Sequence, residues 1–170
     1  MGNLNVLINE SRIEKRISEM AKEIEKDYKG EDIVFVCILK GAAMFTIELA
    51  KKIQNDVELE FIEASSYNGT ESTGVIKVHN DITGNIEGRH VIIVEDLIDT
   101  GRTLEHIKKH LLSMNPASLK IATLLSKPSR RIFELDVDYI GFQIGDDFVV
   151  GYGMDYNQKY RNLPYIGRIE

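Results

Sequence analysis

The side chains best suited to chemistry follow an apolar run at residues 91–94. Glu95 and Asp96 are adjacent carboxylates, and carboxylates accept hydrogen bonds from donors such as the two neighbouring hydroxyls of a ribose. Dinucleotide-binding folds use an acid at a strand end for this purpose. Strand ends are also polar simply because they meet solvent. Two acids in tandem, with a third at Asp99, favour a binding site.

Two hydroxyls and a glycine come next, at Thr100, Gly101 and Thr103. Backbone N–H groups in a glycine-containing turn before a helix can converge on a phosphate together with such hydroxyls. The alternative is that Asp99 or Thr100 caps the helix. A capping box from Thr100 needs Glu or Gln at position 103, where Thr stands, so the helix start is predicted to be open to a ligand. The stretch as a whole could hold a molecule with a phosphate and a diol.

Alternating strands and helices are predicted to position these groups. Apolar runs indicate buried strands, and apolar residues at helical spacing indicate helices. The alternation predicts an α/β fold with a mainly parallel twisted sheet and helices on both faces, in which ligands bind at the carboxyl ends of the strands. Residues 143–170 show little periodicity and are predicted to form small strands and loops that cap the sheet. Strands are predicted at 33–39, 57–64, 75–79, from 91, 118–126 and 137–142, and helices at 11–28 (with Ser11 and Glu14 as a capping box), 42–53 and 104–114.

Size and charge limit the class of protein. The 170 residues predict one domain with one core, and the net charge of −6 argues against a nucleic-acid or anionic-membrane partner. Cys37 lies in an apolar run, which predicts a buried and inert thiol. The longest apolar run, at residues 33–39, is too short to cross a bilayer, and residues 1–11 lack a signal-peptide pattern, so a cytoplasmic location is expected. The sequence has no P-loop and no G-x-G-x-x-G motif.

Residues 94–104, VEDLIDTGRTL, resemble the phosphoribosyl-pyrophosphate binding motif of the phosphoribosyltransferases. More narrowly, the chain from its first helix onwards resembles the bacterial hypoxanthine (hypoxanthine-guanine) phosphoribosyltransferases of the type I family. The motif at 94–104 is specific to the superfamily, and the other motifs point to the branch that acts on 6-oxopurines. In chain order the motifs are Leu39-Lys40-Gly41, Ser66-Tyr67, residues 94–104, Lys127, Phe148-Val149-Val150-Gly151, Asp155-Tyr156-Asn157 and Arg161.

The resemblance implies a purine-salvage reaction. N9 of hypoxanthine, and of guanine, attacks C1′ of phosphoribosyl pyrophosphate and displaces pyrophosphate, giving IMP or GMP. Mg²⁺ is implied as cofactor, because the leaving pyrophosphate gathers negative charge. The implied type I fold is a single domain over residues 1–170, with a core over about 9–126 and a small C-terminal hood formed mainly by 127–170 with the extreme N-terminus. A homodimer or homotetramer is implied as well.

The resemblance also implies roles for the central stretch. Glu95 and Asp96 hold the ribose diol and, with Asp155, face the metal ion. Asp99 takes the proton from purine N7 as N9 attacks, which makes it the catalytic residue. The residues implied to hold the 5′-phosphate, beside Asp99, are Thr100, Gly101, Arg102 and Thr103.

Three further residues are implied to contact the purine. The ammonium group of Lys127 only donates hydrogen bonds, so it suits the O6 acceptor of a 6-oxopurine and disfavours the amino group of adenine. It could also belong to a solvated basic patch with Arg130 and Arg131. Phe148 offers its ring to the purine face, and the backbone near Val149 reads the purine edge.

The groups that bind pyrophosphate and a lid loop complete the implied site. The Leu39-Lys40 peptide can be cis and, followed by Gly41, offers its N–H to pyrophosphate, which Arg161 meets as a donor fork. The polar loop at 65–74 can close as a lid that excludes water, with Ser66 and Tyr67 nearest the reacting centre, or it can be a plain hairpin loop.

Two other functions fit the sequence less well. A regulator that senses phosphoribosyl pyrophosphate and contacts RNA is disfavoured by the acidic charge and by the presence of Asp99, Lys127 and Asp155. A phosphotransfer domain with an aspartyl nucleophile is disfavoured because residues 96–100 read D-x-x-D-T instead of D-x-D-x-T.

Overall fold

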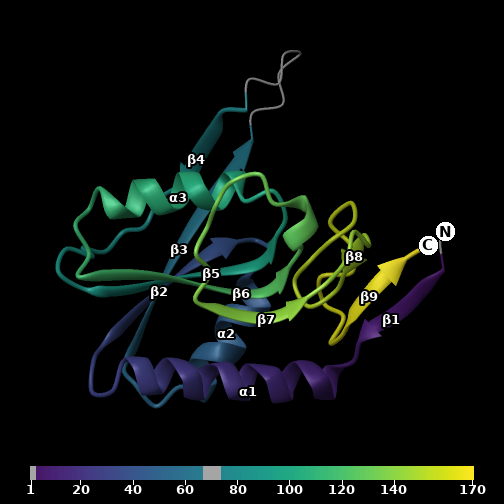
Figure 1. The fold of residues 1–170 in the computed structure, drawn as a ribbon, viewed down its shortest axis with the longest axis horizontal. Helices are drawn as coiled ribbons and strands as arrows, with labels where there is room; N and C mark the ends of the chain where they lie inside the picture. The colour runs from purple at the N-terminus through teal and green to yellow at the C-terminus, as the bar shows by residue number, and fades with distance from the viewer. Residues whose placement is uncertain (1–2, 67–73) are drawn as a thin grey trace.

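The structure is a computed structural model that describes residues 3–66 and 74–170. A six-stranded sheet with the strand order β4-β3-β2-β5-β6-β7 forms its centre (Figure 1). Every neighbouring pair is parallel except β3 and β4, which confirms the predicted mainly parallel α/β fold. The elements are β1 (Leu4–Ile8), α1 (Glu10–Asp27), β2 (Ile33–Leu39), α2 (Ala43–Lys52), β3 (Val57–Ser66), β4 (Ile76–Asn80), β5 (His90–Ile98), α3 (Arg102–Leu112), β6 (Ser118–Ser126), the 3-10 turn η1 (Pro128–Arg130), β7 (Tyr139–Gln143), β8 (Val149–Val150) and β9 (Ile166–Ile169).

The central strands are buried on both faces, because helices cover both sides of the sheet. Successive side chains of a strand point to opposite faces. In β2, Phe35 therefore packs in the cluster beneath α1 and α2, whereas Val34 and Val36 pack in the cluster beneath α3. Figure 1 shows α1 and α2 on one side of the sheet and α3 on the other. The predicted helices on both faces are confirmed.

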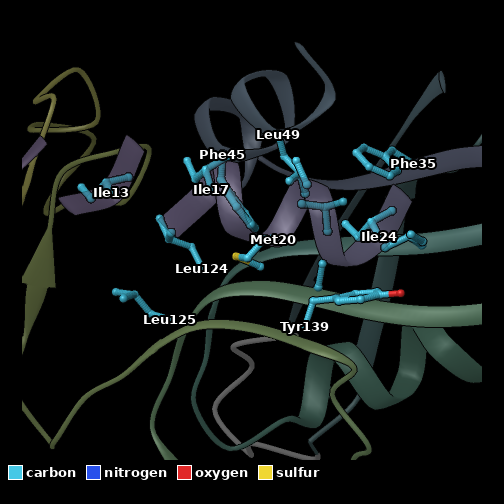
Figure 2. Packing of buried hydrophobic residues seen from close by; sticks show 14 of the residues in the cluster. Ile13, Ile17, Met20, Ile24, Phe35, Phe45, Leu49, Leu124, Leu125 and Tyr139 are labelled. Carbon is cyan, nitrogen blue, oxygen red and sulfur yellow. The ribbon is translucent and has the colours of Figure 1, made fainter. Parts of the chain in front are cut away.

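Helix α1 buries one stripe of apolar side chains against the sheet and α2. Ile17, Met20 and Ile24 are fully buried and, in Figure 2, gather with Phe45 and Leu49 of α2. Complete burial of such a side chain contributes about 1.5–3 kcal/mol relative to its exposure. The stripe holds α1 against one face of the sheet.

The predicted capping box at the start of α1 is wrong. The helix begins at Glu10, and its N-cap is Asn9, whose Oδ1 accepts a hydrogen bond from the Arg12 backbone N–H at 3.0 Å. Ser11 instead donates its hydroxyl to the same Asn9 oxygen at 3.0 Å. Asn9 suits this position because β1 ends one residue earlier and the chain must turn directly into the helix.

A second, three-stranded sheet in the order β1-β9-β8 joins the two ends of the described chain (Figure 1). Strand β1 pairs antiparallel with β9, and β9 pairs antiparallel with β8. Between η1 and β8 the chain returns to the large sheet as β7, which pairs parallel with β6. The small sheet therefore takes the chain ends, whereas part of the segment that follows residue 127 lies in the large sheet.

Strand β5 is longer than the sequence predicts. The acids at positions 95 and 96 were expected where the strand ends, but pairing with β6 continues through Glu95 opposite Thr123 to Ile98 opposite Ser126. Helix α3 begins at Arg102, two residues before its predicted start. In the part of the chain that the structure describes, no helix is long and apolar enough to cross a membrane.

Candidate active site

The carboxyl ends of β2, β5 and β6 meet at one edge of the sheet. Cys37 of β2 lies opposite Val94 of β5, and Ile98 of β5 lies opposite Ser126 of β6. The segments that follow these strands are therefore neighbours. Lys127 stays attached to the edge because its backbone N–H donates to the Ile98 carbonyl at 2.9 Å. This edge is where an open α/β sheet binds ligands.

The two adjacent acids lie in different environments. Glu95 is buried, with 8% of its surface exposed, whereas Asp96 is half-buried. Burial, reinforced by the neighbouring Asp96 charge, raises the pKa of Glu95 well above its ordinary value. The Asp96 side chain is held by the backbone, because its Oδ1 accepts a hydrogen bond from the Leu97 N–H at 2.7 Å. The Glu95 side chain is held in the same way, because its Oε1 accepts a hydrogen bond from the Asp96 N–H at 3.0 Å. A cation or hydroxyl donors brought by a ligand would offset the cost of charge on Glu95.

The start of α3 is open, as the sequence predicts. Its N-cap is Gly101, whose φ of 86° lies in the left-handed region that favours glycine, and within the described residues no side chain caps the helix. Thr100 Oγ1 lies 3.4 Å from the Arg102 backbone N, at the limit of a hydrogen bond. The helix start lines a cavity of about 170 Å³ together with Glu95 and residues 97–100. Whole ligands occupy pockets of roughly 300–1,000 Å³, so this cavity fits one group such as a phosphate.

Arg102 contributes its backbone N–H to this loop, and its side chain contacts Phe133. Its guanidinium carbon lies 5.8 Å from the ring centre of Phe133, in a cation–π arrangement. The backbone N–H of Arg102 is among the first of α3, where the helix dipole favours an anion. Thr103 lines the same cavity and is half-buried.

Asp99 accepts hydrogen bonds from two arginine side chains in the structure. Its Oδ1 accepts a hydrogen bond from Arg130 Nε at 2.6 Å, and its backbone carbonyl accepts one from Arg131 Nε at 3.3 Å. Arg131 also donates to Ser126 Oγ at 2.8 Å. Lys127 is buried, with 6% exposed. The alternative of a solvated basic patch does not describe this trio, because Lys127 is buried, Arg131 is half-buried and Arg130 is paired with Asp99.

The segment that follows Lys127 is bound to the loop before α3 through the backbone as well. The Thr100 carbonyl accepts hydrogen bonds from the N–H groups of Ile132 at 3.0 Å and Phe133 at 3.2 Å. The loop expected to hold a phosphate is thus bonded to the segment that follows Lys127. Arg130 is a functional candidate that the sequence indicated only as a member of a basic patch. Its only signal there was a positive charge three residues after Lys127.

Phe148 comes directly before β8, and Val149 is the first residue of that strand. Phe148 is 53% exposed, and its ring meets the ring of Tyr156 edge to face, with 5.8 Å between centres. Val149 is buried and pairs with Arg168 of β9. An exposed aromatic face beside a fixed backbone edge is the arrangement that a planar heterocycle would need.

Asp155 and Arg161 form an ion pair in the loop that follows β8. Arg161 Nη2 lies 3.2 Å from Asp155 Oδ1, and Arg161 Nη1 donates to the Gly153 carbonyl at 2.7 Å. Gly153 in turn packs against the Gly41 carbonyl, so this loop reaches the turn after β2. The Leu39–Lys40 peptide bond in that turn is cis, and Lys40 is exposed.

Two expectations concern the metal and the lid. Among the residues that the structure describes, no three His, Cys, Asp or Glu side chains form a group that could hold a metal ion, and this includes the expected set of Glu95, Asp96 and Asp155. Ser66 is exposed at the end of β3, whereas Tyr67 lies outside the described residues.

Comparisons with known proteins decide the family. The sequence profile of the phosphoribosyl transferase domain matches residues 6–157. The chain belongs to the phosphoribosyltransferase family. A hypoxanthine-guanine phosphoribosyltransferase of Streptococcus pneumoniae is 47% identical over 163 residues, covering 95% of this chain and 91% of that protein. One from Staphylococcus aureus is 45% identical over 166 residues, covering 97% and 93%.

Solved phosphoribosyltransferases have the same fold. The crystal structure of a hypoxanthine-guanine phosphoribosyltransferase from Bacillus anthracis, with a HEPES molecule in its active site, superimposes with a TM-score of 0.95 at 47% identity and covers 100% of both chains. A hypoxanthine phosphoribosyltransferase from S. aureus gives a TM-score of 0.93 at 45% identity, covering 98% and 91%. The type I phosphoribosyltransferase fold expected from the sequence is confirmed.

Proposed function

We propose that this chain is a purine-salvage enzyme that transfers the 5-phosphoribosyl group from phosphoribosyl pyrophosphate to N9 of hypoxanthine and guanine. The products are IMP or GMP and pyrophosphate. The observation that carries the proposal is the edge formed by β5 and β6, which brings together the open start of α3, the acids at 95 and 96 and the buried Lys127, whose backbone N–H donates to the Ile98 carbonyl of β5. The relatives of matching length are named for the same activity.

The loop between β5 and α3 holds phosphoribosyl pyrophosphate by its 5′-phosphate and its ribose. Backbone N–H groups at the start of α3 and the hydroxyls of Thr100 and Thr103 surround the phosphate in the cavity of about 170 Å³. Asp96 and Glu95 accept hydrogen bonds from the ribose diol. Arg161 and the Lys40–Gly41 backbone bind the pyrophosphate group on the opposite side of the sugar, which fixes C1′ between the leaving group and the purine.

The purine lies between the unit that contains Asp99 and Lys127 and the ring of Phe148. Lys127 donates to O6, and the edge of the purine meets the backbone of Val149. As N9 forms its bond to C1′, the C1′–O bond to pyrophosphate breaks and its electron pair leaves with pyrophosphate. Asp99 accepts the N7 proton, which keeps the purine from accumulating positive charge. Exclusion of water protects the cation-like ribosyl centre, a role that we assign to the loop at 65–74.

The donor set fits Mg²⁺ that is bound largely by the substrate. Mg²⁺ keeps several waters and is usually held by one or two carboxylates together with substrate phosphates. The buried Glu95 and the adjacent Asp96 supply such carboxylates, and Asp155 lies in the loop that packs on Gly41. When bound, the metal ion neutralises charge on the leaving pyrophosphate.

The setting of the enzyme follows from its chemistry. Phosphoribosyl pyrophosphate and IMP are polyanions that do not cross bilayers unaided, so we place the enzyme in the cytoplasm as a single domain over residues 1–170. We also propose a homodimer or homotetramer. Its support is a set of exposed apolar side chains on two consecutive elements of the chain, Met44 and Ile47 of α2 and Leu59 and Phe61 of β3, which are 39–45% exposed.

A spectrophotometric assay with phosphoribosyl pyrophosphate and each purine base tests the function. Hypoxanthine and guanine should give IMP and GMP with Mg²⁺ present, and EDTA should stop the reaction. Adenine serves as the control base and should react far more slowly. Failure to form a nucleotide from hypoxanthine, guanine or xanthine would refute the proposal.

A further inference from the structure

The ion pair between Arg130 and Asp99 is not used by the proposed reaction. Arg130 Nε lies 2.6 Å from Asp99 Oδ1, and the two side chains are 48% and 42% exposed. A distance this short indicates a charge-assisted hydrogen bond. The hydrogen bond to Asp99, and then its negative charge, raise the pKa of Arg130. The carboxylate that should meet the purine is therefore already bound by the chain's own guanidinium.

The backbone keeps Arg130 at this place. It is the last residue of η1, and its N–H donates to the Lys127 carbonyl at 3.1 Å. Immediately after it, the chain is tied to Asp99 and Thr100 by the hydrogen bonds of Arg131 and Ile132. Arg130 is thus anchored on both sides, and only its side chain is free to leave Asp99.

A second carboxylate is near Arg130 when it leaves. The charge of Asp146 also acts on the Arg130 guanidinium. The preceding residue, Ser129, donates its hydroxyl to Asp146 Oδ1 at 2.9 Å, which fixes Asp146 beside η1. Asp146 lies two residues before Phe148 in the sequence. After its release from Asp99, the Arg130 guanidinium therefore still has a carboxylate nearby, that of Asp146.

We propose that Arg130 is a positioning residue that holds the Asp99 carboxylate in the free enzyme and is displaced from it by the incoming 6-oxopurine. The proposal rests on the proposed function. The N7–H of the purine and the Nε–H of Arg130 both donate to the Asp99 carboxylate and share its negative charge, so each weakens the hydrogen bond that the other makes. Arg130 lowers the apparent affinity for the base and keeps Asp99 aimed at the site until a base arrives.

The expected effect is modest because the pair is half exposed. Exposed ion pairs contribute little to stability, and the loss of one such competitor should change the KM for the base by about two- to fivefold. Hypoxanthine is uncharged, so its own encounter with the enzyme is insensitive to salt. Ionic strength acts on the pair, because raising salt from about 0.01 M to 0.15 M shortens the Debye length from about 30 Å to 8 Å.

Steady-state kinetics at saturating phosphoribosyl pyrophosphate test this inference. Arg130→Gln should lower the KM for hypoxanthine about two- to fivefold, and Arg130→Lys, which keeps the charge, should stay within about twofold of the wild type. Added salt should lower the wild-type KM for hypoxanthine and leave that of Arg130→Gln nearly unchanged. The matched control is Arg89→Gln. Arg89 forms an ion pair of the same 2.6 Å length with Glu58, with 32% and 44% exposure, before β5 at the opposite edge of the sheet.

The outcomes separate this inference from the proposed function. An unchanged or higher KM for hypoxanthine in Arg130→Gln, with the salt response of the wild type, overturns the role of Arg130 while the enzyme still makes IMP. The same fall in KM in Arg89→Gln also overturns it, because the effect would then be a general one of lost charge. Wild-type protein that forms no nucleotide from any 6-oxopurine refutes the function itself. Thermal unfolding of each variant verifies that it is folded.

Discussion

Gly41 lies directly against the side chain of Asp96, so that a Cβ atom at position 41 would overlap the Asp96 carboxylate. On its other side the Gly41 carbonyl lies against Gly153, where a Cβ atom would overlap that carbonyl oxygen. The turn after β2 is therefore packed between an acid of β5 and the loop that carries Asp155 and Arg161. This close packing links the groups assigned to the ribose with those assigned to pyrophosphate.

Gly41→Ala is expected to lower kcat/KM for phosphoribosyl pyrophosphate by about 10- to 100-fold, because a displacement of about 1 Å in a reacting group can cost as much. The added methyl group must push the Asp96 carboxylate away. Initial rates at varied phosphoribosyl pyrophosphate measure the effect. Gly145→Ala is the control, since a Cβ atom there meets nothing closer than Asp147 Oδ2 at 4.0 Å. Equal rates for Gly41→Ala and wild type would show that Asp96 has room to move.

Asp99→Asn is expected to lower kcat about 100-fold or more, because an amide cannot accept the N7 proton. Phosphoribosyl pyrophosphate should still bind, since the phosphate cavity is formed mainly by residues 97–104, including their backbone, and Asn is nearly isosteric with Asp. Single-turnover rates measure the chemical step, and calorimetric titration measures the binding. Unchanged turnover would remove Asp99 from its role as general base.

The sheet could be predicted from the sequence because its central strands are buried on both faces. A run such as that at 91–94 is apolar at every position, and the helices between such runs show a clear apolar spacing, as in α1. The motif at 94–104 also predicted an open helix start, which the structure has at the N-cap Gly101, although the helix begins two residues before its predicted start. Each of these features depends on residues that are close together in the sequence, so the pattern of those residues predicts it.

Contacts between distant segments could not be predicted. The pairing of Asp99 with Arg130 and the packing of Gly41 between Asp96 and Gly153 join positions that are 31 or more residues apart. The length of β5 was wrong for a related reason. Polar residues at 95 and 96 indicate a strand end only if no neighbour pairs with them, and β6 does pair with this part of β5.

Replacing Lys127 is expected to weaken the choice between oxopurines and aminopurines. Lys127→Ala removes the donor for O6, so the ratio of kcat/KM for hypoxanthine to that for adenine should fall about 10-fold or more. Because Lys127 is only 6% exposed, Ala leaves space in the edge, and Lys127→Met is a second variant that fills the volume without the charge. Both variants should show the lower ratio when the two bases are assayed separately. A ratio equal to that of the wild type would contradict the role of Lys127.

At the opposite edge of the sheet, Asp27 is expected to make stability depend on pH. The hydrogen bond from the Tyr139 hydroxyl to Asp27 Oδ2, at 2.5 Å, lowers the pKa of Asp27 below its ordinary value of 3.8, and Lys120 at 3.3 Å acts in the same direction. A carboxyl group with a lowered pKa in the folded state stabilises the protein above its unfolded pKa and loses this contribution as the pH falls through the folded value. The stabilisation should be about 0.5–1 kcal/mol at neutral pH, because Asp27 is partly exposed.

Urea unfolding of wild type and Asp27→Asn between about pH 3 and pH 8 measures this contribution. The free energy of unfolding should be higher for the wild type above about pH 5, and the difference should shrink as the pH falls below the ordinary value of 3.8. Tyr139→Phe, made in both backgrounds, gives a double-mutant cycle that isolates the pair. Its coupling energy should decline over the same acidic range, because a protonated Asp27 accepts the hydroxyl less strongly than the charged form does. A coupling energy that stays constant down to pH 3 would show that the charge of Asp27 plays no part in the bond.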